Sequence, residues 1–379
     1  MITFLFWFFI IIILYIYFAY PILLLVIGKL SSTPLVHKSN IWPKVSLIIA
    51  AYNEEKVILK KIENALALDY PKDILEIIIV SDGSTDRTNE IVKIFIEQGV
   101  KFIALDKNQG KSAAENAAMK IATGEIFVFS DATGLYNQNA LKDLIRPFAD
   151  SIVGCVVGLV KYENENASSV SGGEGLYWKY ETFLRRLESE VGNLAMASGS
   201  IMACRRSFVE TLDEAVGEDF VIPMMAAKKG YLTVFEPSAI SMESIVERPR
   251  DLLRTKIRII SKDLRGLYIN KEILNPFRFP LYAWGLISHK LLRWLVPYFL
   301  IVIFFANLFL LSIPFYLSVF IVQMFFYISS IIGYVWQKKK KPPLIFAIPF
   351  SFSLVNLAAL IGVGKSIAGK KSGKWETYR

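Results

Sequence analysis

Long apolar runs occupy both ends of the chain and frame a mixed region between them. Residues 2–27 contain no charged side chain, and a helix of this length crosses about 30 Å of hydrocarbon. Three further apolar runs cover 291–312, 314–336 and 344–363. We predict transmembrane helices at 2–28, 291–312 and 314–336, and a transmembrane or re-entrant segment at 344–363.

The flanks of the first run indicate a membrane anchor rather than a cleaved signal peptide. No basic region precedes the run, and no small-x-small cleavage site follows it. Lys29 and Lys38 come after it, so the positive-inside rule places the amino terminus outside and the next region in the cytoplasm. We therefore expect a multi-pass protein of the cytoplasmic membrane whose central domain is cytoplasmic.

The basic tail at 364–379 conflicts with a simple count of crossings. The run QKKKKPP at 337–343 indicates a cytoplasmic loop, so a full crossing by 344–363 would leave the tail outside. A re-entrant segment would return the tail to the cytoplasmic face, and an ordinary short span with an outer basic tail is the alternative. The residues that could interrupt a helix here are Pro349, Asn356 and Gly362.

Between the apolar ends, strand-like runs alternate with segments of helical period. The strand-like runs are KVSLIIAAYNE, LEIIIVSDGS, KFIALD and EIFVFSD, and the helical patterns are EEKVILKKIENALALDY, DRTNEIVKIFIEQ and KSAAENAAMKIA. Such alternation predicts an α/β fold with right-handed crossovers and a mostly parallel sheet. We assign this domain to 40–247 and expect basic amphipathic or interfacial helices at 248–290.

Polar residues directly follow the predicted strands. The segments Tyr52-Asn53-Glu54 and Ser81-Asp82-Gly83, together with Asp106 and Asp131, lie at strand carboxyl ends, where parallel sheets bind ligands. Each could instead be a turn or a helix cap, for which Asp and Gly are ordinary choices. The first strand is followed by neither a Gly-x-Gly-x-x-Gly nor a Walker sequence, which disfavours dinucleotide and phosphate-loop sites.

Composition narrows the classes of function. The chain has 379 residues, of which 54% are hydrophobic, with only two histidines and two cysteines, and this disfavours a zinc site or a histidine-based triad. The net charge of +9 lies mostly beside the apolar runs and no nucleic-acid motif occurs, so we expect no nucleic-acid partner. A membrane transporter stays an alternative, although the spans carry no convincing charge relay.

Two helical patterns follow the strand-rich region. Residues 173–193 carry Tyr177, Trp178 and Tyr180, which suit a sugar or lipid acceptor or simply pack in a core. Residues 248–267 combine an apolar stripe with a cationic one, a pattern typical of a helix on an anionic leaflet. The cationic stripe consists of Arg250, Arg254, Arg258, Lys262 and Arg265.

Taken in order, these segments resemble the family 2 glycosyltransferases, inverting membrane enzymes with the GT-A fold, and among them the poly-N-acetylglucosamine, hyaluronan and cellulose synthase-like proteins. The likeness covers about 44–265 and rests on LIIAAYNEE, IIIVSDGSTDRT, NQGKSAAENAAMKIATGEIFVFSDAT, GED at 217–219 and the basic segment after it. It implies a nucleotide site formed by Ala51, Tyr52, Asn53, Glu54, Asp82, Gly83, Lys111, Ser130 and Asp131.

The resemblance also implies a divalent metal and a catalytic base. The family's Asp-x-Asp element reads Asp131-Ala132-Thr133 here, so Asp131 would hold Mg²⁺ or Mn²⁺ and the diphosphate would complete its coordination. The family's acid pair falls on Glu218 and Asp219, and Asp219 matches the base that takes the acceptor's proton.

The family's Gln/Arg-x-x-Arg-Trp element is only partly present. Arg254 and Arg258 stand in its place, but Ile259 occupies the position of the tryptophan, so processivity does not follow. We assign Arg254, Arg258 and Trp178 to the diphosphate and the acceptor.

The resemblance predicts a hexosyl- or N-acetylhexosaminyltransferase that uses a nucleotide sugar, a UDP-sugar in the first instance. Its acceptor would be a growing extracellular polysaccharide, and transfer to a polyprenyl-linked or other lipid-linked acceptor is the alternative. Its further partners would be membrane lipids and an accessory membrane or export subunit.

Overall fold

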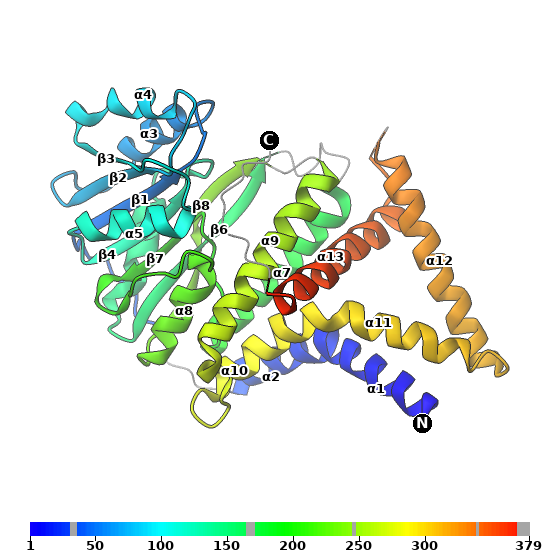
Figure 1. The fold of residues 1–379 in the computed structure, drawn as a ribbon. Coiled ribbons are helices and arrows are strands. Elements are labelled where there is room, and N and C mark those ends of the chain that lie inside the picture. Colours follow the sequence, from blue (N-terminus) through cyan, green and yellow to red (C-terminus); the bar gives the residue numbers. More distant parts are fainter. Residues whose placement is uncertain (31–35, 164–170, 245–247, 339–340, 370–379) are drawn as a thin grey trace.

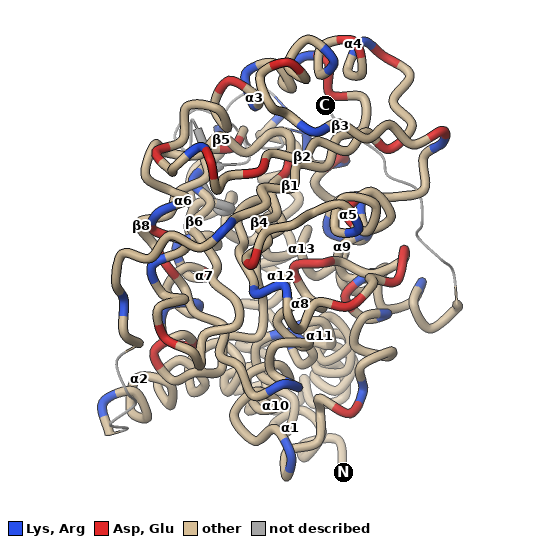
Figure 2. The backbone as a smooth tube through the Cα atoms, turned by 90° about the vertical axis from the view of Figure 1, so that its left-hand side faces the viewer, with Lys and Arg blue, Asp and Glu red and all other residues tan. Residues whose placement is uncertain are grey.

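The computed structural model describes residues 1–30, 36–163, 171–244, 248–338 and 341–369. An α/β domain lies at one end of the molecule and long apolar helices lie at the other, with α7, α9 and α13 between them (Figure 1). Charged residues are spread over the α/β domain, whereas the apolar helices α1 and α11 are almost free of them (Figure 2). The basic tail at 370–379 is outside the described residues.

A single mixed sheet organises the α/β domain. Its eight strands are ordered β3-β2-β1-β4-β7-β6-β8-β5, with β1 parallel to β2 and β4, and β7 antiparallel to β4 and β6. The predicted α/β fold with a parallel core is therefore confirmed. The strands are β1 Val45–Ala51, β2 Leu75–Ser81, β3 Val100–Ala104, β4 Ile126–Asp131, β5 Leu135–Tyr136, β6 Val153–Glu163, β7 Met202–Arg205 and β8 Leu232–Ser244.

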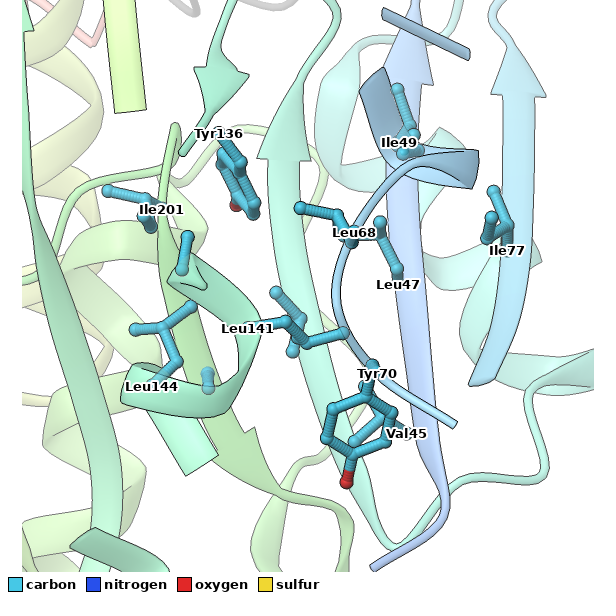
Figure 3. Packing of buried hydrophobic residues seen from close by; sticks show 14 of the residues in the cluster. Val45, Leu47, Ile49, Leu68, Tyr70, Ile77, Tyr136, Leu141, Leu144 and Ile201 are labelled. Carbon is cyan, nitrogen blue, oxygen red and sulfur yellow. The ribbon is translucent and has the colours of Figure 1, made fainter. Parts of the chain in front are cut away.

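Helices cover both faces of this sheet. Residues of β1 alternate between the two cores, as shown for Val45, Leu47 and Ile49 on one side in Figure 3. That side is covered by α3 Ile58–Leu66, α4 Thr88–Lys93 and α6 Ala140–Ile145, and the other by α5 Lys111–Ile121 and α8 Glu218–Lys228. Short 3-10 turns occupy Ile96–Gln98, Arg146–Ala149, Arg206–Phe208 and Lys271–Leu274.

Two long helices join this domain to the apolar part. They are α7 Ser171–Val191 and α9 Pro249–Ile269. The apolar stripe of α9 packs against α8, α10 and α13 through a shared core that includes Ile260 and Leu267. This corrects the expectation that the stripe faces lipid, because periodicity alone cannot tell a lipid surface from a protein one.

Within the described ranges, four continuous helices are long and apolar enough to cross a membrane. They are Ile2–Leu30, Pro280–Leu308, Pro314–Trp336 and Leu344–Ile367. The first consists of α1 Ile2–Leu14, a π turn Tyr15–Ala19 and α2 Tyr20–Leu30, and the second of α10 Pro280–Leu286, a π turn Ile287–Leu291 and α11 Leu292–Leu308. The second begins well before residue 291, so 280–290 continues this helix instead of lying in a separate interfacial one.

The last apolar helix, α13, runs unbroken from Leu344 to Ile367. The expectation that Pro349, Asn356 or Gly362 interrupts it is therefore wrong, since a proline early in an apolar helix is tolerated. α13 packs along α9, with Phe350 and Leu354 against Leu252 near one end, and Gly362 against Ile260 near the other. The apolar helix before α13 along the chain is α12, Pro314–Trp336.

Candidate active site

The loops after β1 and β2 hold each other in place. Asn53 is the one non-glycine residue of the described chain with a positive φ, 52°, a region that asparagine tolerates better than most residues. Its side-chain oxygen accepts the N–H of Thr85 at 2.8 Å, and its own N–H donates to Ser84 Oγ at 3.0 Å. The two segments predicted to hold a nucleotide therefore form one rigid edge.

Asp82 ties this edge to the loop before α5. Its two carboxylate oxygens accept the backbone N–H groups of Gln109 at 2.8 Å and Gly110 at 2.7 Å. The side chain is fully buried, and this burial raises its pKa. Gly83 is needed beside it, because its φ is +67° and a Cβ would lie 2.5 Å from the Lys107 carbonyl carbon. Asp82 thus fixes the start of α5.

Lys111, the first residue of α5, lies at the centre of a group of carboxylates. Its Nζ lies 2.5 Å from both Asp131 Oδ1 and Glu218 Oε1, and 3.8 Å from Glu115 Oε1. Burial opposes its charge, but Asp131 and Glu218 raise the pKa of Lys111 well above its ordinary value. Conversely, burial would raise the pKa of Asp131, and Lys111 lowers it. Both groups are therefore charged at neutral pH.

A second lysine lies behind Asp131, on α3. Lys61 is almost fully buried, donates to Ser130 Oγ at 2.7 Å and to the Gly134 carbonyl, and lies 4.2 Å from the centre of the Tyr136 ring. Burial lowers its pKa to about 7. Lys61 holds the end of β4 and the turn that follows it, a role that sequence reasoning did not identify.

The first turn of α8 supplies the predicted acid pair. Glu218 is bound to Lys111, and Asp219 lies one residue further along the helix. Burial and the neighbouring Glu218 raise the pKa of Asp219 to about 6. Asp263 of α9 faces the same point, because its Oδ1 and that of Asp219 lie 3.6 Å and 2.7 Å from a Cβ built on Gly217. Burial, and then Asp219, raise the pKa of Asp263 well above its usual range.

These residues line one large pocket of about 1040 Å³. It extends from Asp131 at the carboxyl edge of the sheet, past Asp219, to Tyr17 and Phe352 on the apolar helices. Of the predicted site residues, it brings together Glu54, Lys111, Asp131, Trp178, Glu218, Asp219 and Arg258. Those outside its lining are Ala51, Tyr52, Asn53, Asp82, Gly83, Ser130 and Arg254.

The residues outside the lining have identifiable positions. Asp82 and Ser130 are buried, and their side chains bond within the protein. Arg254 is exposed on α9. Several charged residues that line the pocket were not assigned to the site from the sequence, among them Glu243, Lys262 and Asp263. Lys262 belongs to the recognised cationic stripe, but only the packing of α9 shows that it points inward.

Aromatic and charged side chains form the end of the pocket nearest the apolar helices. Trp178 lies with its ring centre 5.2 Å from that of Tyr162, and Lys256 Nζ lies 4.9 Å from the centre of the Tyr177 ring. Beyond them, Glu181 of α7 accepts from Arg293 and lies 3.2 Å from His289 Nε2. Burial opposes the charge of Glu181, but Arg293 and His289 lower its pKa well below the ordinary value.

The donor set at Asp131 suits a hard divalent cation. Asp131 offers a carboxylate that is one-third exposed, and Thr133, which carries a hydroxyl, lines the same pocket. Mg²⁺ and Mn²⁺ prefer such oxygen ligands and are commonly bound through one or two carboxylates plus phosphate oxygens. Among the described residues, no group of three or more His, Cys, Asp or Glu side chains is arranged to hold a metal ion, so these side chains alone do not form a closed metal site.

The mixed sheet and the polar pocket beyond β1, β2 and β4 define a GT-A-type domain. Within it, residues 46–213 match the family described as Glycosyl transferase family 2. The predicted resemblance is confirmed at this level.

Two curated relatives extend the comparison. Probable glycosyltransferase YdaM of Bacillus subtilis (strain 168) is 32% identical over 217 residues, which are 53% of this chain and 50% of that protein. Poly-beta-1,6-N-acetyl-D-glucosamine synthase of Staphylococcus aureus (strain COL) is 28% identical over 256 residues, 63% of this chain and 59% of that protein. The chain thus matches between half and about three-fifths of the length of these relatives.

A solved structure shares the fold over nearly the whole chain. The mannosyltransferase PcManGT from Pyrobaculum calidifontis, in complex with GDP-Man and Mn²⁺, superposes with a TM-score of 0.74. The two sequences are 21% identical, and the match covers 97% of this chain and 100% of that chain. This likeness shows the arrangement of the domain and the apolar helices.

Proposed function

We propose that the protein is an inverting hexosyl- or N-acetylhexosaminyltransferase that moves a sugar from a UDP-sugar or another nucleotide sugar to a growing polysaccharide. The supporting observation is the single pocket that joins the sheet edge, the acid pair and the apolar helices. A donor bound at the sheet edge and an acceptor held near the membrane would meet at Asp219.

The nucleotide end is formed by the loops after β1 and β2. Glu54 lines the pocket there, while Asn53 and Asp82 hold the loops in shape. In this proposal the base and ribose lie at Glu54, beside the loop of Tyr52 and Asn53, and the diphosphate lies against the Lys111–Asp131 pair. A rigid edge of this kind reduces the entropy lost on binding.

Asp131 would hold Mg²⁺ or Mn²⁺ at the diphosphate. When bound, such an ion neutralises phosphate charge and so makes the nucleoside diphosphate a better leaving group. The related structure of PcManGT was solved with Mn²⁺ and a nucleotide sugar, which supports this assignment. Lys111 and Arg258 add positive charge to the same region of the pocket.

Asp219 would act as the catalytic base. It accepts the proton of the acceptor hydroxyl as that oxygen forms a bond to the anomeric carbon, while the bond from this carbon to the diphosphate oxygen breaks. A single displacement of this kind inverts the anomeric centre. The raised pKa of Asp219, about 6, leaves the carboxylate ionised and basic near neutral pH.

The acceptor would lie along the aromatic end of the pocket. Tyr177 and Trp178 offer flat apolar faces that suit sugar rings. Tyr17 and Phe352 belong to helices long enough to span the membrane, so a lipid-linked acceptor could reach the same place and is the second candidate. We place the domain on the cytoplasmic face, with membrane lipids and an accessory or export subunit as partners.

The test uses the full chain purified in detergent and returned to lipid vesicles. It is supplied with a panel of labelled UDP- and GDP-sugars, and the products are sized and their anomeric configuration determined by NMR. Long chains with inverted linkage support a polysaccharide synthase, and single additions extracted into organic solvent support a lipid-linked acceptor. If no sugar is transferred or hydrolysed from any donor, the transferase proposal fails and a transporter becomes the better hypothesis.

A further inference from the structure

The pairing of β5 with β8 brings a second carboxylate to the turn that carries Asp131. This turn is closed by a hydrogen bond from the Gly134 N–H to the Asp131 carbonyl, 3.3 Å long. β5 starts at the next residue, where Leu135 pairs with Met242 of β8 in an antiparallel register. Glu243 follows Met242 directly, so it lies opposite the turn.

The Glu243 side chain lines the pocket, and one of its two carboxylate oxygens has no hydrogen-bond partner in the protein. It lines the same pocket as Asp131, and its Oε1 is buried with no hydrogen bond. A buried carboxylate oxygen that accepts nothing costs free energy comparable to a lost hydrogen bond, and more when it is charged. Most buried polar atoms in native structures have a partner, which can be an ordered water or an ion, so an unpaired carboxylate oxygen at the pocket wall is a candidate ligand for a bound cation.

Two lysines of the site, Lys61 and Lys111, have hydrogen-bond partners other than Glu243. Lys61 Nζ already donates to Ser130 Oγ and to the Gly134 carbonyl, and it faces the Tyr136 ring. Neither of these two hydrogen bonds goes to Glu243. Lys111 is likewise engaged by Asp131 and Glu218.

Glu243 also offers a second carboxylate, which the segment directly after Asp131 lacks. The segment Asp131-Ala132-Thr133 has a hydroxyl, not a carboxylate, at its third position. Because Gly134 follows Thr133 and lies next to the paired strand, Glu243 approaches this position from β8. Two carboxylates and the phosphate oxygens match the ligand preference of Mg²⁺ and Mn²⁺ better than one carboxylate does.

We propose that Glu243 is a second carboxylate ligand of the divalent cation held by Asp131. The cation site would thus be assembled from two strands, β4 through its turn and β8, and completed by the diphosphate. This inference rests on the proposed nucleotide-sugar site and specifies which residues of the chain hold its metal.

The test measures how much Mn²⁺ strengthens nucleotide binding. UDP affinity, and separately GDP affinity, is measured by calorimetry on the full chain in detergent, with Mn²⁺ and with EDTA. For each nucleotide, the affinity with Mn²⁺ is divided by the affinity with EDTA. Because the coupling of two ligands is reciprocal, this ratio reports metal binding without any turnover. For Glu243→Gln we expect this ratio to fall by at least about tenfold, since losing even an outer-shell partner of a metal ligand costs this much, while affinity in EDTA stays unchanged.

Three variants make the result decisive. Asp251→Asn removes another carboxylate of the pocket lining and should keep the wild-type ratio, whereas Asp131→Asn should abolish the Mn²⁺ effect. Glu243→Asp keeps the charge on a shorter side chain and should retain part of the ratio, and it carries the test if Glu243→Gln does not fold.

A wild-type ratio in Glu243→Gln, or in Glu243→Asp alone if only that variant folds, overturns the inference but leaves the proposed function standing. A wild type that binds nucleotide equally well with and without Mn²⁺ overturns the metal assignment as a whole.

Discussion

Lys111 stands at a helix start, where the helix dipole disfavours a positive charge. The site compensates this by surrounding the ammonium with Asp131, Glu218 and Glu115. A cation in the middle of several carboxylates lets them remain ionised in a buried pocket. The same arrangement places positive charge where the diphosphate is proposed to bind. Lys111 would therefore balance the charge of the carboxylates in the free protein and that of the phosphates when the donor is bound.

Asp219 should govern the pH dependence of the rate. Burial and Glu218 raise its pKa to about 6, and only the ionised form can accept a proton. We therefore expect kcat to be level above about pH 7, to be halved near pH 6 and to fall about tenfold per pH unit below about pH 5. This profile is measured with a saturating donor, and a rate that stays constant down to pH 5 would argue against Asp219 as the base.

Replacing Asp219 separates catalysis from binding. Asp219→Asn should reduce kcat by roughly two to four orders of magnitude, which is the usual contribution of a general base, and should leave the affinity for the nucleoside diphosphate unchanged. Asp213→Asn is the matched control, because Asp213 lies on the nearby surface and pairs with Arg265 at 3.1 Å. Loss of nucleotide affinity in Asp219→Asn would point to a structural role at the start of α8.

Asp131 should be essential for the metal but not for folding. Its side chain is one-third exposed, so Asp131→Asn should unfold at nearly the wild-type temperature. We expect its turnover to fall by at least about a hundredfold, since it removes a carboxylate that holds the ion at the diphosphate. Excess EDTA should inactivate the wild type, and added Mn²⁺ or Mg²⁺ should restore it. Near-normal turnover of the variant would show that the metal is held elsewhere.

At the scale of single residues, the sequence predicts which residues lie at the strand ends, but not which residues of distant segments lie against them. Asp131 and Asp219 are recognisable from their motifs, because local order in the chain carries the signal. Glu243 and Asp263 come from β8 and α9, and their positions depend on strand pairing and helix packing between distant segments. No local pattern encodes such contacts, so sequence reasoning could not assign them to the site.

At the scale of elements, α9 shows where periodicity stops being informative. Its two stripes follow from the sequence, and the helix forms as predicted over Pro249–Ile269. The apolar stripe covers protein, and the basic residues divide among different tasks: Arg258 and Lys262 face the pocket, while Arg265 pairs with Asp213. A helical moment identifies the faces of a helix, and only tertiary packing identifies what each face contacts.

The Asp82 carboxylate should be a structural clamp between elements. It accepts two backbone N–H groups from the loop before α5, and the amide of Asp82→Asn can accept at only one atom. Leaving a buried N–H unpaired costs about 1–3 kcal/mol, so the melting temperature should fall by several degrees. Thermal unfolding in detergent measures this, with Asp73→Asn, at an exposed aspartate before β2, as the control. An unchanged melting temperature combined with weaker nucleotide binding would instead indicate direct contact with the ribose.

At the scale of the whole molecule, the pocket exists because three parts meet. The sheet edge supplies Asp131, α8 supplies Asp219, and the apolar helices supply Tyr17 and Phe352. The α/β order and the apolar helices follow from the sequence, since each is a local pattern. The path of the pocket between the α/β domain and the apolar helices does not follow from the sequence, because it depends on how α7, α9 and α13 pack together.

The placement of α13 leads to a prediction about membrane topology. Gly362 packs against Ile260 of α9, and α9 shares a core with α8 of the α/β domain. The carboxyl end of α13 is therefore held near the domain, so we expect Ala368 to lie on the same side of the membrane as the domain. The turn between α11 and α12, at Ser312, should lie on the opposite side if those helices cross. The positive-inside rule points the same way, because Lys365 lies close to Ala368.

Single cysteines at exposed positions test this topology in cells. Cys155 and Cys204 are fully buried and can stay in place, because a membrane-impermeant maleimide does not reach them in the folded protein. Ser312→Cys should react in intact cells, whereas Ala368→Cys and the domain control Ser151→Cys, both exposed sites, should react only after permeabilisation. Labelling of Ala368→Cys in intact cells to the same extent as Ser312→Cys would mean that α13 crosses the membrane completely. The packing of α13 on α9 would then have to be accommodated within the bilayer, and the proposed acceptor path beside Phe352 would open toward lipid.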